Sequence, residues 1–176
     1  MARPRSFDID DALDKAMHVF WTHGYEGASL PDLLDGMGLT RGSLYKAFTD
    51  KKTLFMQVLQ RYERQAVQAG VAKLSDPSIP NGAERIMAMF QGSYQNVVNG
   101  DDRGCLLCTA AAGPSSYDDE IAKAVSDGLG ALRDGIYAAL GASPKHATLT
   151  PAERAALAGR IARPRQDDAG DGAGEA

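Results

Sequence analysis

The chain has 176 residues, of which 44% are hydrophobic and 24% charged, a composition that excludes disordered and fibrous classes of protein. Its 19 basic and 23 acidic side chains give a formal net charge of -4, which argues against a polybasic coat for nucleic acid. Two cysteines exclude a disulfide scaffold, and no apolar run forms a signal core or approaches the roughly 18–20 residues of a membrane span, so we expect a cytoplasmic protein.

The first half of the chain shows helical patterns with recognisable ends. Apolar residues recur at helical spacing from Ile9 to Phe20, which predicts an amphipathic helix. Ser29 and Asp32 have the spacing of a capping box, and Thr40 is a favourable N-cap. We therefore expect helices over residues 9–24, 29–36, 41–48 and 51–73.

The second half continues as helical segments that glycine and proline separate. The expected helices span residues 82–99, 103–112, 116–140 and 150–162. No alternating apolar pattern indicates a strand, so the predicted fold class is all-α. From residue 163 the chain lacks large apolar side chains, which predicts a disordered tail over residues 163–176.

Two short helices that a glycine turn joins, packed on a longer first helix, form a helix-turn-helix whose second helix enters the major groove of DNA. In the segment 41–48, Leu44 and Phe48 lie four residues apart and can face the first helix. The opposite face carries residues that can approach phosphates or base edges: Arg41, Gly42, Tyr45 and Lys46. The sequence thus predicts an N-terminal three-helix DNA-binding domain.

The local charge supports this interpretation. Residues 41–52 contain four basic residues and one acid, a net charge of +3, whereas residues 8–35 contain one basic residue and seven acids, a net charge of -6. Arg3 and Arg5 form a basic arm that can lie along phosphates or in the minor groove. A solvated helix pair with scattered lysines is the weaker interpretation, because caps, turn glycines and positive charge coincide.

Several short motifs follow a single pattern: Gly24-Tyr25, Ser29, Gly38-Leu39-Thr40, Gly42-Ser43-Leu44-Tyr45, Phe48 and Lys51. Together they resemble the DNA-binding segment of TetR-family transcriptional regulators, over about residues 5 to 60. The sequence departs from the family pattern at Leu34 and Met37, where the family usually has Ala, and at Ala28, which is often Thr. We expect the first two departures to shift the packing of the short helices without touching the DNA-facing positions.

The resemblance implies a homodimer in which domain 1–50 binds a palindromic operator and domain 51–162 binds a small-molecule effector. The family default is a repressor that the effector releases from DNA. The helix that begins at Lys51 would connect the domains, and Lys51 and Lys52 would hold a phosphate beside its N-terminus. The predicted DNA-binding residues are Arg3, Arg5, Ser29, Thr40, Arg41, Gly42, Ser43, Tyr45, Lys46, Lys51 and Lys52.

Dimers of the family usually form through the last two long helices. The candidates here are the segments 116–140 and 150–162, of which the second is short. We therefore expect either that dimerisation uses a shorter bundle or that this chain is a truncated form with a weakened interface.

The segment Gly104-Cys105-Leu106-Leu107 resembles a subset of TetR-family regulators that includes electrophile and oxidant sensors. Cys105 would lie in the first turn of a helix beside Arg103, and both features lower the pKa of a thiol. Cys105 and Cys108 are therefore candidates for a thiol switch. We favour two small buried apolar residues, because free cysteine is among the most buried residue types; the thiol switch stays open.

An effector pocket is expected in the C-terminal helices. The predicted lining residues are Met87, Phe90, Tyr94, Cys105, Tyr117 and Tyr137, although residues at such helical spacing more often form plain core. An apolar cavity with one or two polar groups would suit a hydrophobic or aromatic effector.

Other functions have little support in the sequence. No zinc-protease motif, P-loop or serine-nucleophile motif is present, so we expect neither an enzyme nor a metal or cofactor. The competing function is a helix-turn-helix that contacts protein instead of DNA. Salt dependence distinguishes the two, since DNA binding through several phosphates weakens steeply as salt increases.

Overall fold

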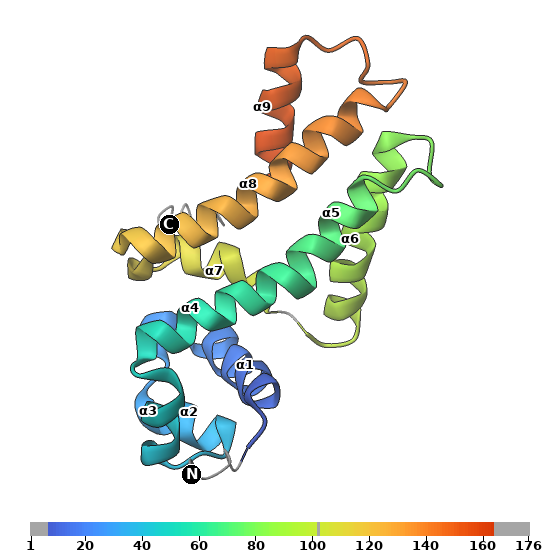
Figure 1. Cartoon of the computed structure of the whole chain (residues 1–176). Coiled ribbons are helices and arrows are strands. Elements are labelled where there is room, and N and C mark those ends of the chain that lie inside the picture. The colour runs from blue at the N-terminus through green and yellow to red at the C-terminus, as the bar shows by residue number, and fades with distance from the viewer. Residues whose placement is uncertain (1–6, 102, 164–176) are drawn as a thin grey trace, which may run out of the picture.

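The computed structural model describes residues 7–101 and 103–163, and every regular element in this part of the chain is a helix (Figure 1). The N-terminal unit consists of α1 (Ile9–Gly27), α2 (Leu30–Met37) and α3 (Arg41–Phe48). A long rod follows, made of α4 (Lys51–Tyr62), a π-helical turn (Glu63–Val67) and α5 (Gln68–Leu74). The remaining elements are α6 (Gly82–Val98), α7 (Leu106–Ala112), a 3-10 turn (Pro114–Tyr117), α8 (Asp119–Gly141) and α9 (Pro151–Ala162).

The predicted all-α fold with an N-terminal helix-turn-helix is confirmed. The predicted basic arm at Arg3 and Arg5 lies outside the described residues, as does the predicted tail from residue 164 onward. Among the described residues, no helix is long and apolar enough to cross a membrane.

The short helices begin and end at the residues that the sequence marked. Asp32 N donates to Ser29 Oγ at 3.3 Å, and Ser29 N donates to the Asp32 carboxylate at 2.9 Å. Ser43 N donates to Thr40 Oγ1 at 3.2 Å, and Gly38 ends α2 with a left-handed φ of 65°. Isolated helices of this length are unstable in water. The caps therefore supply part of the stability that α2 and α3 lack on their own.

Two irregularities differ from the sequence prediction. The first helix was expected to end near Gly24, but α1 continues to Gly27 across a break at Gly24, where φ is 68° and ψ is 172°. The single helix expected over residues 51–73 contains the π turn Glu63–Val67. Apolar periodicity does not reveal such an insertion, because the pattern on either side remains helical.

One apolar core joins the N-terminal unit to the rod. Phe20 of α1, Phe48 of α3 and Phe55 of α4 are at most 1% exposed, and the rings of Phe20 and Phe55 lie 4.8 Å apart. The same core continues through Leu107 of α7 and Ile121 of α8. The apolar core thus crosses residue 50, and the division into two domains there stays a prediction.

A second, smaller core lies at the far end of the molecule, where α5, α6, α8 and α9 meet: Leu74, Ile86, Ile136, Ala139, Leu140 and Ala158. α9 turns back along the end of α8 (Figure 1). α6 starts against α8 because Gly82 has no side chain. A Cβ at Gly82 would lie 1.6 Å from the carbonyl oxygen of Ala139.

Candidate nucleic-acid interface and cavity

α3 has a buried face and an exposed face. Leu44 and Phe48 are each 1% exposed and belong to the core. The opposite face is exposed and carries the four predicted DNA-facing residues, Arg41, Gly42, Tyr45 and Lys46. α3 therefore offers solvent two cations and a phenol hydroxyl while its other face is held by the core.

Three further predicted DNA-binding residues lie at the beginnings of α2 and α3. Ser29 and Thr40 are exposed N-caps whose hydroxyls are engaged with their own helices, and Ser43 is half-buried one turn into α3. The predicted contribution of these three residues to DNA binding stays a prediction.

Gly42 leaves the surface of α3 open. A Cβ at this position would meet no atom within 4 Å, so packing inside the chain does not require glycine. Glycine in a helix interior costs about 0.5–1 kcal/mol relative to alanine. Its presence here favours a function in which another molecule approaches the backbone of α3.

Lys51 is directed into the chain. Its Nζ lies 4.8 Å from the centroid of the Tyr25 ring and donates to the carbonyl oxygen of Glu26 at 3.3 Å. Burial of the ammonium group lowers the pKa of Lys51. The side chain fastens the start of α4 to the end of α1, and its expected contact with a phosphate stays a prediction.

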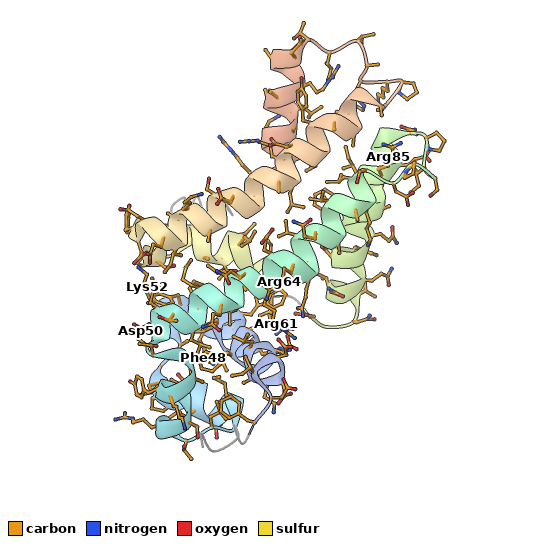
Figure 2. The ribbon with its side chains drawn as sticks, in the orientation of Figure 1. Phe48, Asp50, Lys52, Arg61, Arg64 and Arg85 are labelled. Atoms are coloured by element: carbon orange, nitrogen blue, oxygen red, sulfur yellow. The ribbon has the colours of Figure 1, made fainter. Side chains whose placement is uncertain are left out.

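Lys52 connects α4 to α8. Its Nζ lies 2.8 Å from Asp118 Oδ2 and 2.6 Å from Glu120 Oε2 at the beginning of α8 (Figure 2). The hydrogen bonds raise the pKa of Lys52 and lower the pKa of Asp118. Lys52 would have to leave both carboxylates to hold a phosphate, so the exposed cations nearest the α3 surface are Arg41 and Lys46.

The acids of α1 also have a partner in the rod. Arg61 Nη2 donates to Asp14 Oδ2 at 2.7 Å, and Arg61 Nη1 donates to Asp10 Oδ1 at 2.6 Å (Figure 2). The hydrogen bond from Arg61 lowers the pKa of Asp14. Part of the negative charge of residues 8–35 is therefore compensated inside the chain, which a count of charges along the sequence does not reveal.

The chain also matches known proteins. Residues 12–58 match the family model described as "Bacterial regulatory proteins, tetR family". Over 60 residues the chain is 55% identical to the HTH-type transcriptional repressor ComR of Escherichia coli (strain K12), an alignment that covers 34% of this chain and 29% of ComR. Over 139 residues it is 31% identical to the HTH-type transcriptional regulator YezE of Bacillus subtilis (strain 168), covering 78% of this chain and 70% of YezE. The chain belongs to the TetR family.

A solved structure from the TetR family has the same architecture. It contains a cysteine mutant of the regulator CifR complexed with 26bp double-strand operator DNA. The TM-score is 0.75 at 31% sequence identity, and the match covers 91% of this chain and 84% of that chain. TetR-family regulators are DNA-binding proteins and not enzymes, so the predicted class of DNA-binding regulator is confirmed.

A cavity of about 500 Å³ lies between the rod of this TetR-family chain, helices α6, α7 and α8, and the end of α9. Most of its lining is apolar, with Val67, Met89 and Leu132 among the contributors. Lys73 and Asn96 add polar groups. This combination is typical of a ligand pocket.

Two of the six predicted pocket residues, Phe90 and Cys105, line this cavity. The other four do not: Met87, Tyr94, Tyr117 and Tyr137. α6 turns the face with Met89 and Asn96 toward the cavity, which leaves Met87 and Tyr94 67% and 62% exposed. Helical spacing identifies residues that share a face, but it does not tell which face of an amphipathic helix meets a cavity.

Tyr117 and Tyr137 lie elsewhere for different reasons. Tyr117 is 89% exposed in the 3-10 turn before α8. The ring of Tyr137 lies 5.4 Å from the guanidinium carbon of Arg154, where α8 and α9 meet. The sequence offered no signal for these positions, because each depends on how the last helices cross.

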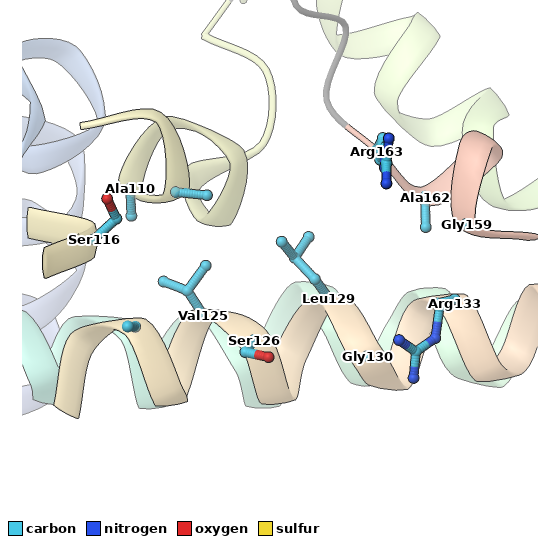
Figure 3. Close-up of a pocket in the computed structure, with 12 residues that line it drawn as sticks. Ala110, Ser116, Val125, Ser126, Leu129, Gly130, Arg133, Gly159, Ala162 and Arg163 are labelled. Atoms are coloured by element: carbon cyan, nitrogen blue, oxygen red, sulfur yellow. The ribbon is translucent and has the colours of Figure 1, made fainter. Parts of the chain in front are cut away.

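A second cavity, of about 420 Å³, lies between α7, α8 and α9 (Figure 3). Val125 and Leu129 point into it from α8, and small residues such as Ala110 and Gly159 complete its walls. Arg133 lies at its rim and donates to the carboxylate of Asp134. The sequence did not predict this cavity.

Cys105 and Cys108 line the 500 Å³ cavity, are half-buried and form no disulfide. The structure makes Cys105 the N-cap of α7 and brings Tyr62 to it, whose hydroxyl donates to Cys105 Sγ at 3.5 Å. Hydrogen bonds from Cys108 and Tyr62 lower the pKa of Cys105 to about 6, against the opposing effect of burial. The pKa of Cys108 is raised, because its proton is shared with Cys105 and because it is buried.

Arg103 contacts other groups beside the thiol, and its expected effect on the pKa of Cys105 stays a prediction. The Arg103 guanidinium lies against Trp21 and Asp101, while Tyr62 and Cys108 provide the hydrogen bonds to the sulfur of Cys105. Sequence reasoning missed Tyr62, which sits 43 residues earlier in the chain. Only the tertiary fold brings the end of α4 to the N-cap of α7.

Proposed function

We propose that the chain is a cytoplasmic, effector-released repressor that binds a palindromic operator as a homodimer. The exposed face of α3 carries this proposal, because Arg41, Tyr45 and Lys46 project from a helix whose other face is buried. The TetR-family relatives support it, since ComR is named a transcriptional repressor and the CifR mutant is complexed with operator DNA.

In this proposal α3 lies in the major groove, with Arg41 and Lys46 at phosphates or base edges and Tyr45 at a phosphate. Arg3 and Arg5 extend the contact along the backbone or into the minor groove. Two copies of the chain, joined through α8 and α9, present two α3 helices to half-sites about 34–36 Å apart. An effector in the 500 Å³ cavity releases the DNA by changing the spacing of the two helices.

The test begins with duplexes selected by the purified protein from a random pool, and we expect a palindromic consensus. Arg41→Ala and Lys46→Ala should each weaken binding to the selected duplex, and Lys46→Ala should reduce the slope of log affinity against log salt by about 1. Lys145→Ala, at an exposed lysine between α8 and α9, is the matched control and should leave affinity and slope unchanged.

Two results would contradict the proposal. If no duplex is enriched, or if binding does not change with salt, the helix-turn-helix contacts protein instead of DNA. If light scattering gives a monomer on and off the selected duplex, the homodimer is wrong.

A thiol-based sensor is the finer proposal that the geometry of Cys105 favours. Its lowered pKa keeps a large fraction of Cys105 as thiolate near neutral pH, at the wall of a cavity that admits a small molecule. The thiolate attacks the β-carbon of an α,β-unsaturated carbonyl compound, and a carbon–sulfur bond forms as the carbon–carbon π bond breaks. The π electron pair moves to the enolate, which takes a proton from solvent.

Cyclohexenone is a suitable probe for this reaction. Mass spectrometry should find one adduct on Cys105, and operator affinity should fall as the adduct accumulates. Cys105→Ser should bind operator and resist release, whereas Cys108→Ser, whose hydroxyl can still donate to Cys105 Sγ, should retain both reaction and release. An adduct that leaves operator affinity unchanged would contradict the thiol function but not the repressor.

A further inference from the structure

Tyr62 lies between the thiol and the N-terminal unit. Its hydroxyl donates to Cys105 Sγ at 3.5 Å, and its ring meets the Trp21 ring edge-on, with centroids 5.3 Å apart and planes at 88°. Tyr62 is only 8% exposed, so packing holds its ring in place. A single side chain of α4 therefore contacts both the sulfur of α7 and a side chain of α1.

Arg103 makes a second connection from the loop that leads into Cys105. Its guanidinium carbon lies 4.7 Å from the centroid of the Trp21 ring, and its Nη1 lies 2.6 Å from His18 Nδ1. Asp101 accepts from Nε and Nη2 of the same guanidinium at 2.7 and 2.8 Å. The residues that precede the thiol are thus tied to the middle of α1.

We propose that Tyr62, Arg103 and Trp21 form a coupling cluster that transmits a change at Cys105 to α1. This inference rests on the proposed thiol function and specifies how a reaction in the cavity reaches the DNA-binding surface. Tyr62 acts as a positioning residue in the cluster, because it orients the thiolate and contacts Trp21 at once.

An adduct on Cys105 disturbs the cluster at Tyr62. The sulfur loses the charge that attracted the Tyr62 hydroxyl, and the added atoms take up space beside the ring. A buried hydroxyl that loses its acceptor is unfavourable, so the Tyr62 side chain shifts toward a new partner. The π turn begins at Glu63, directly after Tyr62, and supplies a segment of helix that can absorb the shift.

α1 carries the disturbance onward because it cannot adapt locally. Ala16 and Phe20, which precede Trp21 in α1, are completely buried in the core shared with α2, α3 and α4. Close-packed cores move as units rather than deform gradually. A displacement of Trp21 therefore changes the position of α3, and a small change in the spacing of two α3 helices abolishes operator binding.

The single tryptophan among the 176 residues makes the coupling directly measurable, because the fluorescence of Trp21 reports its surroundings. Cys108→Ser, in which Cys105 is the remaining thiol, is treated with iodoacetamide. The sulfur–carbon bond forms as the carbon–iodine bond breaks, and iodide leaves with the electron pair. We expect the fluorescence emission of Trp21 to change at the same rate as the alkylation of Cys105, which mass spectrometry follows. Unchanged emission after complete alkylation would overturn the coupling cluster.

Affinity for the selected duplex tests the transmission itself. In Cys108→Ser, alkylation of Cys105 should weaken binding to the selected duplex about tenfold. When Trp21→Phe or Arg103→Gln is added to this variant, alkylation should proceed at the same rate but weaken binding only about twofold. Lys145→Gln, at the exposed lysine between α8 and α9, is the matched control and should retain the tenfold effect. A tenfold effect in both cluster variants would overturn the proposal.

The two measurements separate this inference from the proposed function. A change in Trp21 emission without loss of affinity in Cys108→Ser would support the coupling and contradict the thiol function. Loss of affinity without a change in emission would support the thiol function and overturn the coupling cluster.

Tyr62→Phe tests the positioning role, because it removes the hydroxyl and retains the ring contact with Trp21. Loss of one hydrogen bond to the thiolate should raise the pKa of Cys105, so the pH midpoint of the alkylation rate should rise. A purely structural role would change the melting temperature and leave the midpoint in place, and that result would overturn the role assigned to Tyr62.

Discussion

The N-terminal unit and the outer helices of the C-terminal part are packed differently. In the N-terminal unit, Phe20, Leu33 and Phe48 are at most 1% exposed, whereas α6 leaves Met87 and Tyr94 more than half exposed. Cavities of about 500 and 420 Å³ lie among the C-terminal helices. Helices of eight residues need caps and a filled core to be stable, whereas longer helices can stay folded around a cavity. The packing therefore favours a rigid surface at one end of the molecule and an adaptable cavity at the other.

A few polar side chains join the two regions in addition to the shared core. Lys52 connects α4 to α8, Arg61 connects α4 to α1, and Arg103 connects the loop before α7 to α1. Each connection ends on an element that carries or supports α3. A change in the cavity can therefore reach the N-terminal unit through a small number of contacts.

The largest effect that tests this difference in packing is expected from Phe20→Ala. Phe20 is completely buried against Phe55, so the substitution should lower the free energy of unfolding by about 3–5 kcal/mol, measured by urea denaturation. Phe90→Ala is the matched control. Because Phe90 is 42% exposed, its loss should cost less than about 1 kcal/mol, and equal effects would contradict the difference in packing.

Gly82→Ala tests a close contact between α6 and the backbone of α8. The new Cβ would meet the carbonyl oxygen of Ala139, so α6 must shift at a cost of about 1–3 kcal/mol in the free energy of unfolding. Gly159→Ala in α9 meets no atom within 4 Å and should stabilise the chain slightly. Stabilisation by both substitutions would show that α6 does not start against α8 in this way.

Thr40→Ala tests the dependence of α3 on its cap. Loss of the hydroxyl that accepts from Ser43 N should lower the free energy of unfolding by about 1 kcal/mol. Thr40→Ser retains the acceptor and should be close to the parent. If both variants unfold like the parent in urea, the core alone holds α3.

Gly42→Ala should separate stability from DNA binding. Alanine should stabilise α3 by about 0.5–1 kcal/mol, because it has the higher helix propensity and meets no atom within 4 Å. Affinity for the selected duplex should nevertheless fall, since the added methyl group stands between α3 and the DNA backbone. A variant that is more stable and binds equally well would place the DNA contact on another surface.

The smallest effect is expected from the ion pair between Lys52 and Asp118, which is partly exposed and screened by salt. Lys52→Met should lower stability less than Thr40→Ala does, and Asp118→Asn, which retains the N-cap acceptor, should have a similar effect. Because the pKa of Asp118 is lowered in the folded chain, its contribution is complete above its ordinary pKa of 3.8 and is lost as pH falls through the lowered value. A difference from the parent that does not shrink as the pH falls below 3.8 would contradict the ion pair.

The sequence predicted most of the fold, because the signals that define its helices are local. The capping box at Ser29, the N-cap at Thr40 and the left-handed Gly38 each involve residues at most four positions apart. The two faces of α3 also follow from spacing alone, since Leu44 and Phe48 lie one turn apart. These features depend on neighbours along the chain, so they could be inferred before the chain was folded.

Most of the candidate cavity could not be predicted in this way. Met87 and Tyr94 share the apolar pattern of α6 with Phe90, yet only Phe90 lines the cavity. The sequence predicts that Lys51 and Lys52 together contact a phosphate of DNA. In the structure Lys51 contacts α1, and Lys52 contacts the start of α8. In each case the choice among faces or partners depends on how helices far apart in sequence pack together.

The sequence by itself thus determined the class of fold, the helix ends, the resemblance to the TetR family and the exposed face of α3. Only the tertiary structure decided which basic side chains are exposed and which face of α6 lines the cavity. It also decided that Tyr62 contacts both Cys105 and Trp21. The physical reason is distance along the chain. Helix formation and capping are satisfied within one or two turns, whereas the contacts of Arg61 with Asp14 and of Tyr62 with Cys105 join residues 47 and 43 positions apart.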